Sequence, residues 1–250
     1  MVSRFEGAII AAGHGERLRA GGHRIPKPLV ELNGEPLLVR QARAIMAAGA
    51  EGVLAVINSE SARLGEERAI AMPAGLKLCV RDTPNSMESL FTLGERLSPG
   101  YFLLTTVDAV TEPGELERFA RGAFGMIGSE PDLDGVLGVV RWRGDHRPLF
   151  VEIDARGLIR AFGGAQGLMV TAGVYVFSTR IFDFVSSARE AHCGALREFL
   201  SHLLANKLSF KAIELGETID IDEAADLDAA RAMLERAGRR DNPPKVPSRR

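Results

Sequence analysis

Cysteine is scarce in this sequence, because its 250 residues contain only two, Cys79 and Cys193. They lie far apart and form no CxxC pair, which excludes a disulfide framework and is typical of buried thiols in a reducing compartment. An excess of one charge is also missing, because 31 Lys and Arg residues face 33 Asp and Glu residues. The net charge of −2 provides no broad basic surface for nucleic acid or an anionic membrane. Any anion site must therefore be local.

Long hydrophobic runs are missing as well. No run approaches the ~20 apolar residues of a membrane-spanning helix, and the apolar stretch 7–13 is too short and wrongly flanked for a signal peptide. We therefore expect a cytoplasmic protein without a membrane partner. A hydrophobic content of 46% suits one large globular domain, which we place at residues 1–237. We expect the basic, proline-containing tail 238–250 to be disordered.

Short apolar runs alternate with windows of helical periodicity along the chain. This alternation predicts an α/β fold, a three-layer α/β/α sandwich around a mixed, mostly parallel sheet. The predicted strands are 7–12, 53–57, 76–80, 101–107, 135–142, 149–153, 158–162, 169–177 and 210–215. The predicted helices are 36–49, 61–71, 86–97, 195–205 and 223–237. From residue 134 onward the strands follow one another through short turns, so we expect an antiparallel part of the sheet that shapes a second pocket.

A glycine-rich loop follows the first strand. Gly13 and Gly15 allow backbone N–H groups to approach an anion closely. Two familiar phosphate-binding motifs do not fit. Leu18 stands where the dinucleotide fingerprint needs a third glycine, and no lysine follows the glycines at P-loop spacing. Arg17 and Lys27, the only lysine in the first 76 residues, add two positive groups that suit a polyphosphate. For either residue the alternative is a solvated surface charge.

Two sequence motifs in the first 38 residues occur in a fixed order. "GAIIAAGHGERLR" is followed by "PKPLVELNGEPLL". Together they resemble the nucleotidyltransferases with a glycosyltransferase-A-like fold, the fold of the nucleotide-diphospho-sugar transferases. That family includes sugar-nucleotide pyrophosphorylases, phosphocholine and inositol-phosphate cytidylyltransferases and molybdenum-cofactor guanylyltransferases.

The resemblance implies roles for these residues. Arg17 would neutralise the β- and γ-phosphates of a nucleotide, and Lys27 would bind the α-phosphate and stabilise the charge that develops there. These are the two expected catalytic residues. The backbone expected to bind the nucleotide is that of Ala11, Ala12, Gly13, His14 and Gly15. Such transfer relies on in-line positioning and on cations at the reacting phosphate, which suits a lysine.

Carboxylates near two later segments form a candidate Mg²⁺ site, because Mg²⁺ is usually held by one or two carboxylates together with water and phosphate. Asp108 ends a buried strand at the edge where α/β sheets bind ligands, and a loop cap is its alternative. Asp220 and Asp222 lie in "DIDEAADL", which resembles the family's "DIDTPEDL" and implies that both join Asp108 at the metal. Helix capping is the alternative for Asp222, and Asp226 is expected on a helix surface. The five histidines lack metal-binding spacing.

Two further segments resemble parts of the family that contact the substrates. Residues 83–90 align with the family's base-contacting segment, which implies that Asn85 and Ser89 contact the nucleotide. Asn85, followed by Glu88, also has the pattern of a helix capping box. "TAGVYVFS" at 171–178 resembles the strand that lines the acceptor pocket. The polar patch 142–147 is a candidate for acceptor recognition, with a solvated turn as its alternative.

The resemblance implies a Mg²⁺-dependent nucleotidyltransferase that joins a nucleoside triphosphate to a phosphorylated small-molecule acceptor and releases pyrophosphate. Sugar phosphates, phosphocholine and similar alcohol phosphates are the acceptor candidates. Two alternatives stay open, a noncatalytic regulator of the same fold and a glycosyltransferase. The latter would more often show D-x-D after the fourth strand, whereas Asp108-Ala109-Val110 stands here. The base, the acceptor and a homo-oligomeric state are left open.

Overall fold

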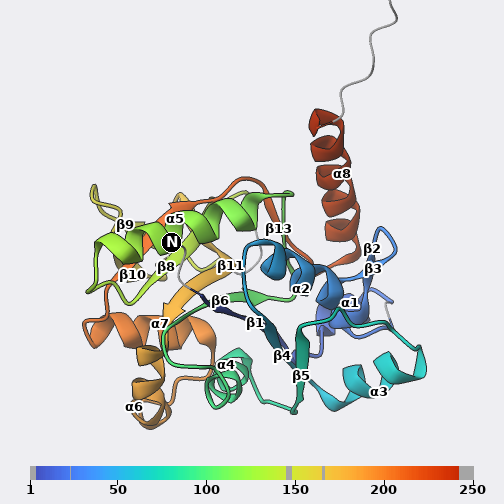
Figure 1. Cartoon of the computed structure of the whole chain (residues 1–250), viewed down its shortest axis with the longest axis horizontal. Helices are drawn as coiled ribbons and strands as arrows, with labels where there is room; N and C mark the ends of the chain where they lie inside the picture. The colour runs from blue at the N-terminus through green and yellow to red at the C-terminus, as the bar shows by residue number, and fades with distance from the viewer. Residues whose placement is uncertain (1–3, 23, 145–147, 165–166, 242–250) are drawn as a thin grey trace, which may run out of the picture.

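Residues 4–22, 24–144, 148–164 and 167–241 are described by the computed structural model of this chain (Figure 1). Its centre is a seven-stranded sheet. The strands, in spatial order, are β12 (Phe210–Glu214), β8 (Gly135–Arg141), β11 (Met169–Ser178), β6 (Tyr101–Thr106), β1 (Glu6–Ala11), β4 (Val53–Ile57) and β5 (Leu76–Val80). All seven were predicted from the sequence, with ends that agree to within one residue.

Within this sheet, and among the described residues, β11 alone runs against its neighbours. It pairs antiparallel with β6 and β8, whereas β1, β4, β5 and β6 are parallel to one another and β12 is parallel to β8. The predicted mixed, mostly parallel sheet is confirmed. The antiparallel part is smaller than expected, because β9 (Val151–Ile153) and β10 (Ile159–Phe162) form a separate hairpin.

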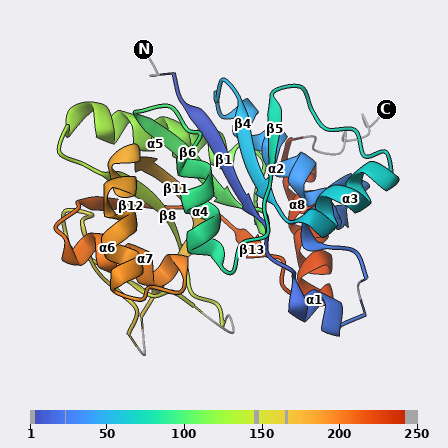
Figure 2. The same ribbon diagram turned by 90° about the horizontal axis from the view of Figure 1, so that it is seen from below.

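Helices cover both faces of the sheet. One face carries α2 (Leu37–Ala47), α5 (Glu115–Ser129) and α8 (Ala224–Asp241), and the other carries α4 (Ser86–Gly94), α6 (Val185–Glu190) and α7 (Leu196–Ala205) (Figure 1, Figure 2). Because strand side chains alternate, Leu103 belongs to the buried cluster under the first layer and Leu104 to the cluster under the second. The three-layer α/β/α sandwich is confirmed.

Short elements connect these layers. They are α1 (Glu16–Ala20), the 3₁₀ turn η1 (Lys27–Leu29), the hairpin of β2 (Glu31–Leu32) and β3 (Glu35–Pro36), α3 (Ser59–Glu67), β7 (Ala109–Thr111), the 3₁₀ helix η2 (Thr179–Phe184) and β13 (Thr218–Asp220). β13 pairs antiparallel with β7 outside the central sheet. This small ladder joins two segments that lie about a hundred residues apart in the sequence.

Some elements differ from the prediction. α5 is absent from the predicted helices, although Leu116, Phe119, Ala120 and Ala123 recur at helical spacing and are all buried. α1 corrects the expectation of an irregular loop up to Lys27, since its five residues are too few to show a period. α8 runs to Asp241, so residues 238–241 of the expected tail are helical. Residues 242–250 of that tail lie outside the described part of the chain.

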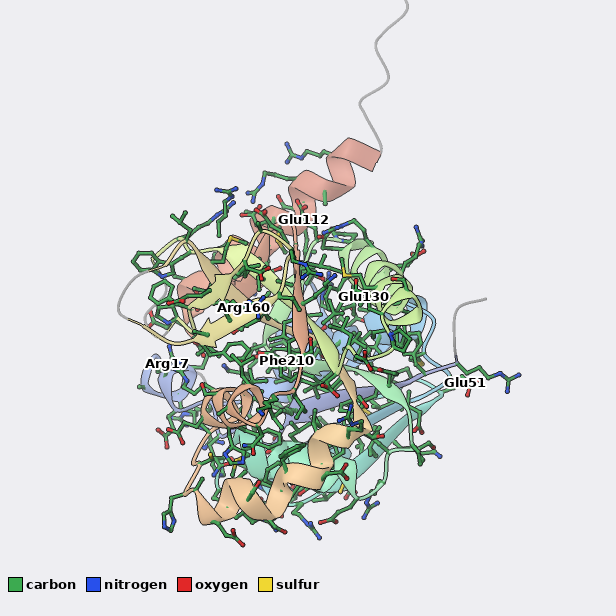
Figure 3. The ribbon with its side chains drawn as sticks, turned by 90° about the vertical axis from the view of Figure 1, so that its left-hand side faces the viewer. Arg17, Glu51, Glu112, Glu130, Arg160 and Phe210 are labelled. Atoms are coloured by element: carbon green, nitrogen blue, oxygen red, sulfur yellow. The ribbon has the colours of Figure 1, made fainter. Side chains whose placement is uncertain are left out.

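β1 lies where the order of the strands reverses. From β1 the chain adds β4 and β5 on one side, and it then returns through α4 to place β6 on the other side. Open α/β sheets bind ligands beyond the carboxyl ends of the strands at such a switch point. That edge contains the residues that follow Ala11 and Thr106. Figure 3 shows Arg17, which follows β1, and Glu51, which precedes β4, on opposite sides of the molecule.

The structure also bears on the expectations about membrane-spanning helices and cysteines. None of the described helices is long and apolar enough to cross a membrane. Both cysteines are free thiols. Cys79 is buried, as expected, whereas Cys193 is partly exposed, which corrects that expectation.

Candidate active site

Lys27 is the centre of an ion cluster at the switch point, which we call the Lys27 cluster (Arg17, Lys27, Asp108 and Asp222). The Lys27 Nζ donates to Asp108 Oδ2 at 2.9 Å and to Asp222 Oδ1 at 2.8 Å. Arg17 Nη2 lies 2.8 Å from the other Asp222 oxygen, Oδ2. Lys27 is only 9% exposed, whereas the Arg17 side chain is 43% exposed. The lysine is therefore held in place, and the arginine has room to turn toward a ligand.

Burial and charge act in opposite directions on this cluster. Burial lowers the pKa of the Lys27 ammonium, but the charge of Asp108 and the hydrogen bonds to both aspartates outweigh it and raise that pKa. Burial likewise raises the pKa of Asp108. The Lys27 charge and hydrogen bonds from Thr106 and Lys27 outweigh this effect and hold that pKa below its ordinary value. Lysine and aspartate are therefore both charged at neutral pH.

The β7–β13 ladder explains how Asp222 reaches Asp108. Asp108 lies in the turn between β6 and β7. Across the ladder Ala109 pairs with Asp220, and the Ile221 N–H donates to the Asp108 carbonyl at 3.1 Å. Asp220 lines the same cleft as both aspartates of the cluster. The structure thus brings Asp108 and Asp222 together and places Asp220 in the same cleft, and metal binding by the three stays a prediction.

Asp226 fixes the backbone next to Asp222. Its Oδ2 accepts the Asp222 N–H at 2.8 Å and the Glu223 N–H at 2.7 Å. The second bond is one of the two bonds of a capping box. In it, the side chain of the third helical residue accepts the backbone N–H of the residue just before the helix. The expectation that Asp226 is plain helix surface is therefore wrong. The alternative of Asp222 as the cap also fails, because its carboxylate is bound to Lys27 and Arg17.

The predicted nucleotide loop forms the turn from β1 into α1, with Ala11 and Ala12 buried and Gly13 and His14 exposed. Asn58, at the carboxyl end of β4, donates from Nδ2 to the Ala12 carbonyl at 3.1 Å. The side chain of Asn58 is fully buried. The neighbouring strand therefore helps to hold the shape of this loop.

Gly15 ends the loop in a conformation that suits glycine. Its φ of 63° lies in the left-handed region, and a Cβ there would lie 3.2 Å from the Lys27 Cβ. The loop backbone consequently packs directly on the lysine of the cluster.

Asn85 and Ser89 lie at the start of α4. The Asn85 Oδ1 caps this helix by accepting the Glu88 N–H at 2.9 Å, which confirms the predicted cap. Ser89 is 1% exposed, and its hydroxyl bonds with Thr83 Oγ1 at 2.6 Å. These bonds shape the segment 83–89, and contact of Asn85 and Ser89 with a nucleotide stays a prediction.

A cleft of about 930 Å³ extends from the Lys27 cluster along the same edge of the sheet, past β11 and β8 to β12. Its lining includes Thr171 and Tyr175 from β11, Ser86 from the start of α4 and Arg197 from the start of α7. The predicted nucleotide loop lies toward β4, because Asn58 at the end of that strand binds the Ala12 carbonyl. The site therefore has two halves that meet at Lys27.

Tyr175 brings a hydroxyl to this cleft, and the residue is only 4% exposed. Burial raises the pKa of this hydroxyl, and the charges of Asp220 and Asp108 raise it further, although a hydrogen bond with Thr171 opposes them. Tyr175 is therefore a neutral hydroxyl close to the carboxylates of the site.

An irregularity in β11 shapes the floor of the cleft. The pairing of β11 with β8 shifts between Thr171 and Tyr175, and Gly173 within this bulge has a φ of 68°. A Cβ on Gly173 would lie 2.6 Å from Thr106 Oγ1 and 2.8 Å from Ala109 Cβ. Only glycine allows β11 to approach the segment that carries Asp108 this closely.

The predicted acceptor patch is only partly described. Trp142 is 45% exposed and packs edge-on against Phe150 with ring centroids 5.4 Å apart. Arg143 lines the cleft and pairs with Glu217 at 3.3 Å. Residues 145–147 of the patch lie outside the described residues.

The carboxylates of the cleft fit a metal that arrives with a ligand. Asp108 and Asp222 share one lysine nitrogen and line the same cleft. In the described ranges, no three His, Cys, Asp or Glu side chains are arranged to hold a metal ion by themselves. Mg²⁺ is typically bound by one or two carboxylates and fills its shell with water and substrate phosphates. The donor set therefore suits Mg²⁺ carried by a triphosphate.

Comparison with known families agrees with this geometry. Residues 7–175 match the sequence model of the MobA-like NTP transferase domain. The chain belongs to that family. The match begins in β1 and ends in β11, so it includes the nucleotide loop, Lys27, Asp108 and Tyr175. The resemblance expected from the sequence is thereby confirmed.

Three similar proteins define the family context. The mannose-1-phosphate guanyltransferase of Gibberella zeae is 27% identical over 193 residues, which are 72% of this chain and 51% of that protein. The bifunctional IPC transferase and DIPP synthase of Rubrobacter xylanophilus is 36% identical over 118 residues, 46% of this chain and 26% of that protein. The chain thus spans about half or less of these relatives. The inositol-1-phosphate CTP transferase of T. maritima has the same fold, with a TM-score of 0.78, 20% identity and coverage of 95% and 98% of the two chains.

Some residues of the site were not found from the sequence. Asn58 had a signal, because an asparagine at the end of a strand followed by Ser59-Glu60-Ser61 is typical of a helix cap. Asp226 had none, because Glu223-Ala224-Ala225-Asp226 lacks the S/T-x-x-E/Q pattern of a capping box. The bulge at Gly173 had only a glycine inside a strand, which is equally typical of close packing.

Proposed function

We propose that this chain is a Mg²⁺-dependent nucleotidyltransferase that joins a nucleoside triphosphate to a phosphorylated small-molecule acceptor and releases pyrophosphate. One observation carries the proposal, the Lys27 Nζ between Asp108 and Asp222 at the switch point of the sheet. Attack at an α-phosphate needs oxygen ligands for the metal and a fixed positive charge at the reacting phosphorus. The Lys27 cluster supplies both.

In this reaction an acceptor phosphate oxygen bonds to the α-phosphorus, and the bond from that phosphorus to the bridging oxygen of the β-phosphate breaks. Asp108 and Asp222, with Asp220 as a further ligand, would hold Mg²⁺, which would supply positive charge beside the phosphate oxygens. Lys27 balances the charge that develops at the α-phosphate. Arg17, which is half-exposed, reaches the leaving pyrophosphate. The side chains only position and neutralise, so no covalent enzyme intermediate is required.

The two halves of the site accept the two substrates. The nucleotide lies on the loop of Ala11–Gly15 and against the segment 83–89, and the acceptor lies in the cleft of about 930 Å³. The relatives support this pair of substrate classes, because their names pair a nucleotide with mannose 1-phosphate or inositol 1-phosphate.

Within this proposal the acceptor is a hydroxyl-rich phosphate, such as a sugar or cyclitol phosphate. Away from the segment 83–89, the polar residues that line the cleft include Thr171, Tyr175 and Arg197. A quaternary ammonium group such as choline is bound best by a cage of several aromatic faces. Among the described residues that line the cleft, Tyr175 is the one aromatic side chain. Phosphocholine is therefore the weaker candidate.

The test is a pyrophosphate-release assay with each of CTP, GTP, UTP, ATP and dTTP, with Mg²⁺ or EDTA. The acceptor panel contains mannose 1-phosphate, inositol 1-phosphate and phosphocholine. We expect Mg²⁺-dependent release that requires an acceptor and is fastest with a sugar or cyclitol phosphate. Tight nucleotide binding without turnover across the panel would overturn the proposal in favour of a regulator. Release of a nucleoside diphosphate from a finished sugar nucleotide would instead indicate a glycosyltransferase.

A further inference from the structure

We infer that the tripeptide Asn58-Ser59-Glu60, where β4 passes into α3, is a positioning unit that holds three segments of the nucleotide half of the site in register. This inference rests on the proposed function, because it takes the nucleotide half from there. None of the three residues belongs to the Lys27 cluster or lines the acceptor cleft. Each of them binds a different segment of the nucleotide half.

Asn58 binds the nucleotide loop. Its Nδ2 donates to the Ala12 carbonyl, and its Oδ1 accepts the Ser61 N–H at 2.8 Å as the cap of α3. Both ends of the amide are thus used in a fully buried site. A donor at the end of the neighbouring strand thus fixes the Ala12 carbonyl. The orientation of the backbone N–H groups that follow Ala12 therefore depends on β4 as well as on β1.

Ser59 binds the segment expected to contact the base. Its N–H donates to Asp82 Oδ1 at 2.9 Å and its hydroxyl donates to Asp82 Oδ2 at 2.6 Å. These hydrogen bonds lower the pKa of Asp82, so the carboxylate stays ionised and the link is charge-assisted. Asp82 is followed directly by Thr83, whose hydroxyl binds Ser89. The link therefore passes from α3 into the segment 83–89.

Glu60 binds α1, the helix that carries Arg17. Its carboxylate pairs with Arg19 Nη2, and Arg19 Nε donates to the His14 carbonyl at 2.9 Å. Through Arg19 the far end of the nucleotide loop and the first helical turn after it are tied to α3. The tripeptide thus reaches both ends of the loop and the start of the base-contacting segment.

The position of the tripeptide in the sheet makes its effect selective. β4 adjoins β1 on the side away from β6, whereas the acceptor cleft runs from β6 toward β12. Loosening the tripeptide should disturb the nucleotide and leave the acceptor nearly untouched. A residue needed only for folding would change both substrates alike or neither.

The first experiment uses Asn58→Ser in the full chain. Serine still caps α3, because its hydroxyl accepts the Ser61 N–H, but its side chain is one bond shorter than that of asparagine and does not reach the Ala12 carbonyl. We expect the Kd of the Mg²⁺ complex of the preferred triphosphate, measured by calorimetry, to rise about tenfold, the equivalent of one lost hydrogen bond. KM for the triphosphate should rise in parallel, while KM for the acceptor should stay within about twofold, as expected for a separate half-site.

The matched control is Asp134→Asn. Asp134 is also a buried polar residue, 3% exposed, and it accepts the Ser209 N–H at 2.9 Å and pairs with Arg180 at the opposite edge of the sheet. This variant should lower Tm as Asn58→Ser does, but leave both KM values unchanged. If the two variants change KM for the triphosphate alike, the effect of Asn58 is global stability and the inference is wrong.

Asp82→Ala tests the link to the base. It removes both bonds to Ser59. We expect the ratio of kcat/KM between the preferred triphosphate and each of the other four to fall by about threefold or more, with a smaller change in kcat. Equal loss with every triphosphate would contradict a role in base selection. If the wild-type protein binds a triphosphate but shows no turnover, the proposed function is wrong. This inference is still tested in that case, because calorimetry compares triphosphate binding by Asn58→Ser and by the wild type.

Discussion

At the scale of single residues, the site depends on a buried lysine balanced by two carboxylates. Lys27 is 9% exposed, and the side chains of Asp108 and Asp222 are 25% and 29% exposed. Breaking a buried ion pair by removing one partner costs about 3–5 kcal/mol, because the remaining charge is left without compensation. The partial exposure of the aspartates reduces this cost here, so Lys27 can be replaced without loss of the fold.

We predict that Lys27→Met lowers turnover by about a hundredfold or more, since electrostatic stabilisation at the reacting phosphate is lost. Tm should fall by a few degrees, because two carboxylates then repel each other. Mg²⁺ should restore part of that Tm. Kinetics and thermal unfolding with and without Mg²⁺ measure these effects. Lys77→Met, at an exposed lysine of β5, is the control and should change neither. Turnover equal to wild type would contradict the role given to Lys27.

Gly173 is a second residue whose replacement should disturb the site through its immediate contacts. We predict that Gly173→Ala lowers both Tm and kcat, because the new Cβ meets Thr106 and Ala109 and the backbone has a positive φ. Gly125→Ala is the control: Gly125 lies in α5 with open space around it, and alanine there should stabilise the helix by about 0.5–1 kcal/mol. An active Gly173→Ala enzyme of unchanged Tm would show that the bulge is dispensable.

At the scale of elements, the first turn of α8 sets the position of Asp222. We predict that Asp226→Ala raises the Mg²⁺ concentration needed for half-maximal activity, because the backbone N–H groups of Asp222 and Glu223 lose their acceptor. Loss of such a cap also costs about 0.5–2 kcal/mol of stability. Asp228→Ala, on the exposed side of the same helix, should leave the Mg²⁺ dependence unchanged. Equal Mg²⁺ curves for both variants would exclude a role for Asp226.

The junction of α5 with β13 makes a pH-dependent prediction. A hydrogen bond from Arg118 outweighs burial and, with one from the Gly216 N–H, lowers the pKa of Glu115. The ionised form therefore stabilises the fold above the usual glutamate pKa, and this contribution is lost as the pH falls through the lowered value. Glu115→Gln should lower Tm at pH 7, and the difference from wild type should shrink as the pH falls below about 4.3, the usual glutamate pKa. A difference that is constant with pH would contradict this assignment.

How far the sequence predicts these elements depends on their length and on their partners. The strands of the central sheet are short apolar runs, which are a local pattern, and their positions follow from the sequence alone. β7 and β13 have three residues each, and each is paired only through the other, so no local pattern predicts the ladder that brings Asp222 to Asp108. The resemblance to "DIDTPEDL" supplied that link instead. α5 shows a clear helical period and was predictable.

At the scale of the whole molecule, the reversal of strand order at β1 divides the active edge into two halves. One half, over β1, β4 and β5, contains the glycine loop and the segment 83–89, and the other, over β6 to β12, contains most of the cleft of about 930 Å³, which Ser86 of that segment also lines. Charge type and motif order predicted the four residues of the Lys27 cluster, which the structure brings together, and their contact with phosphates stays a prediction. The hydrogen bond from Asn58 to the Ala12 carbonyl is a tertiary contact, which a single sequence does not predict. The sequence predicts only the other bond of Asn58, in which its side chain caps α3.

Phosphorus NMR of the working reaction tests the central claim most directly. The protein is mixed with its preferred triphosphate, Mg²⁺ and acceptor phosphate, and the phosphorus signals are followed in time. The account predicts that the β- and γ-phosphorus leave together as pyrophosphate while the α-phosphorus enters a new diphosphate linkage with the acceptor, and that Asp108→Asn and Asp222→Asn slow this conversion by orders of magnitude. Release of inorganic phosphate from the γ-position, or equal rates in the two variants and the wild type, would contradict it.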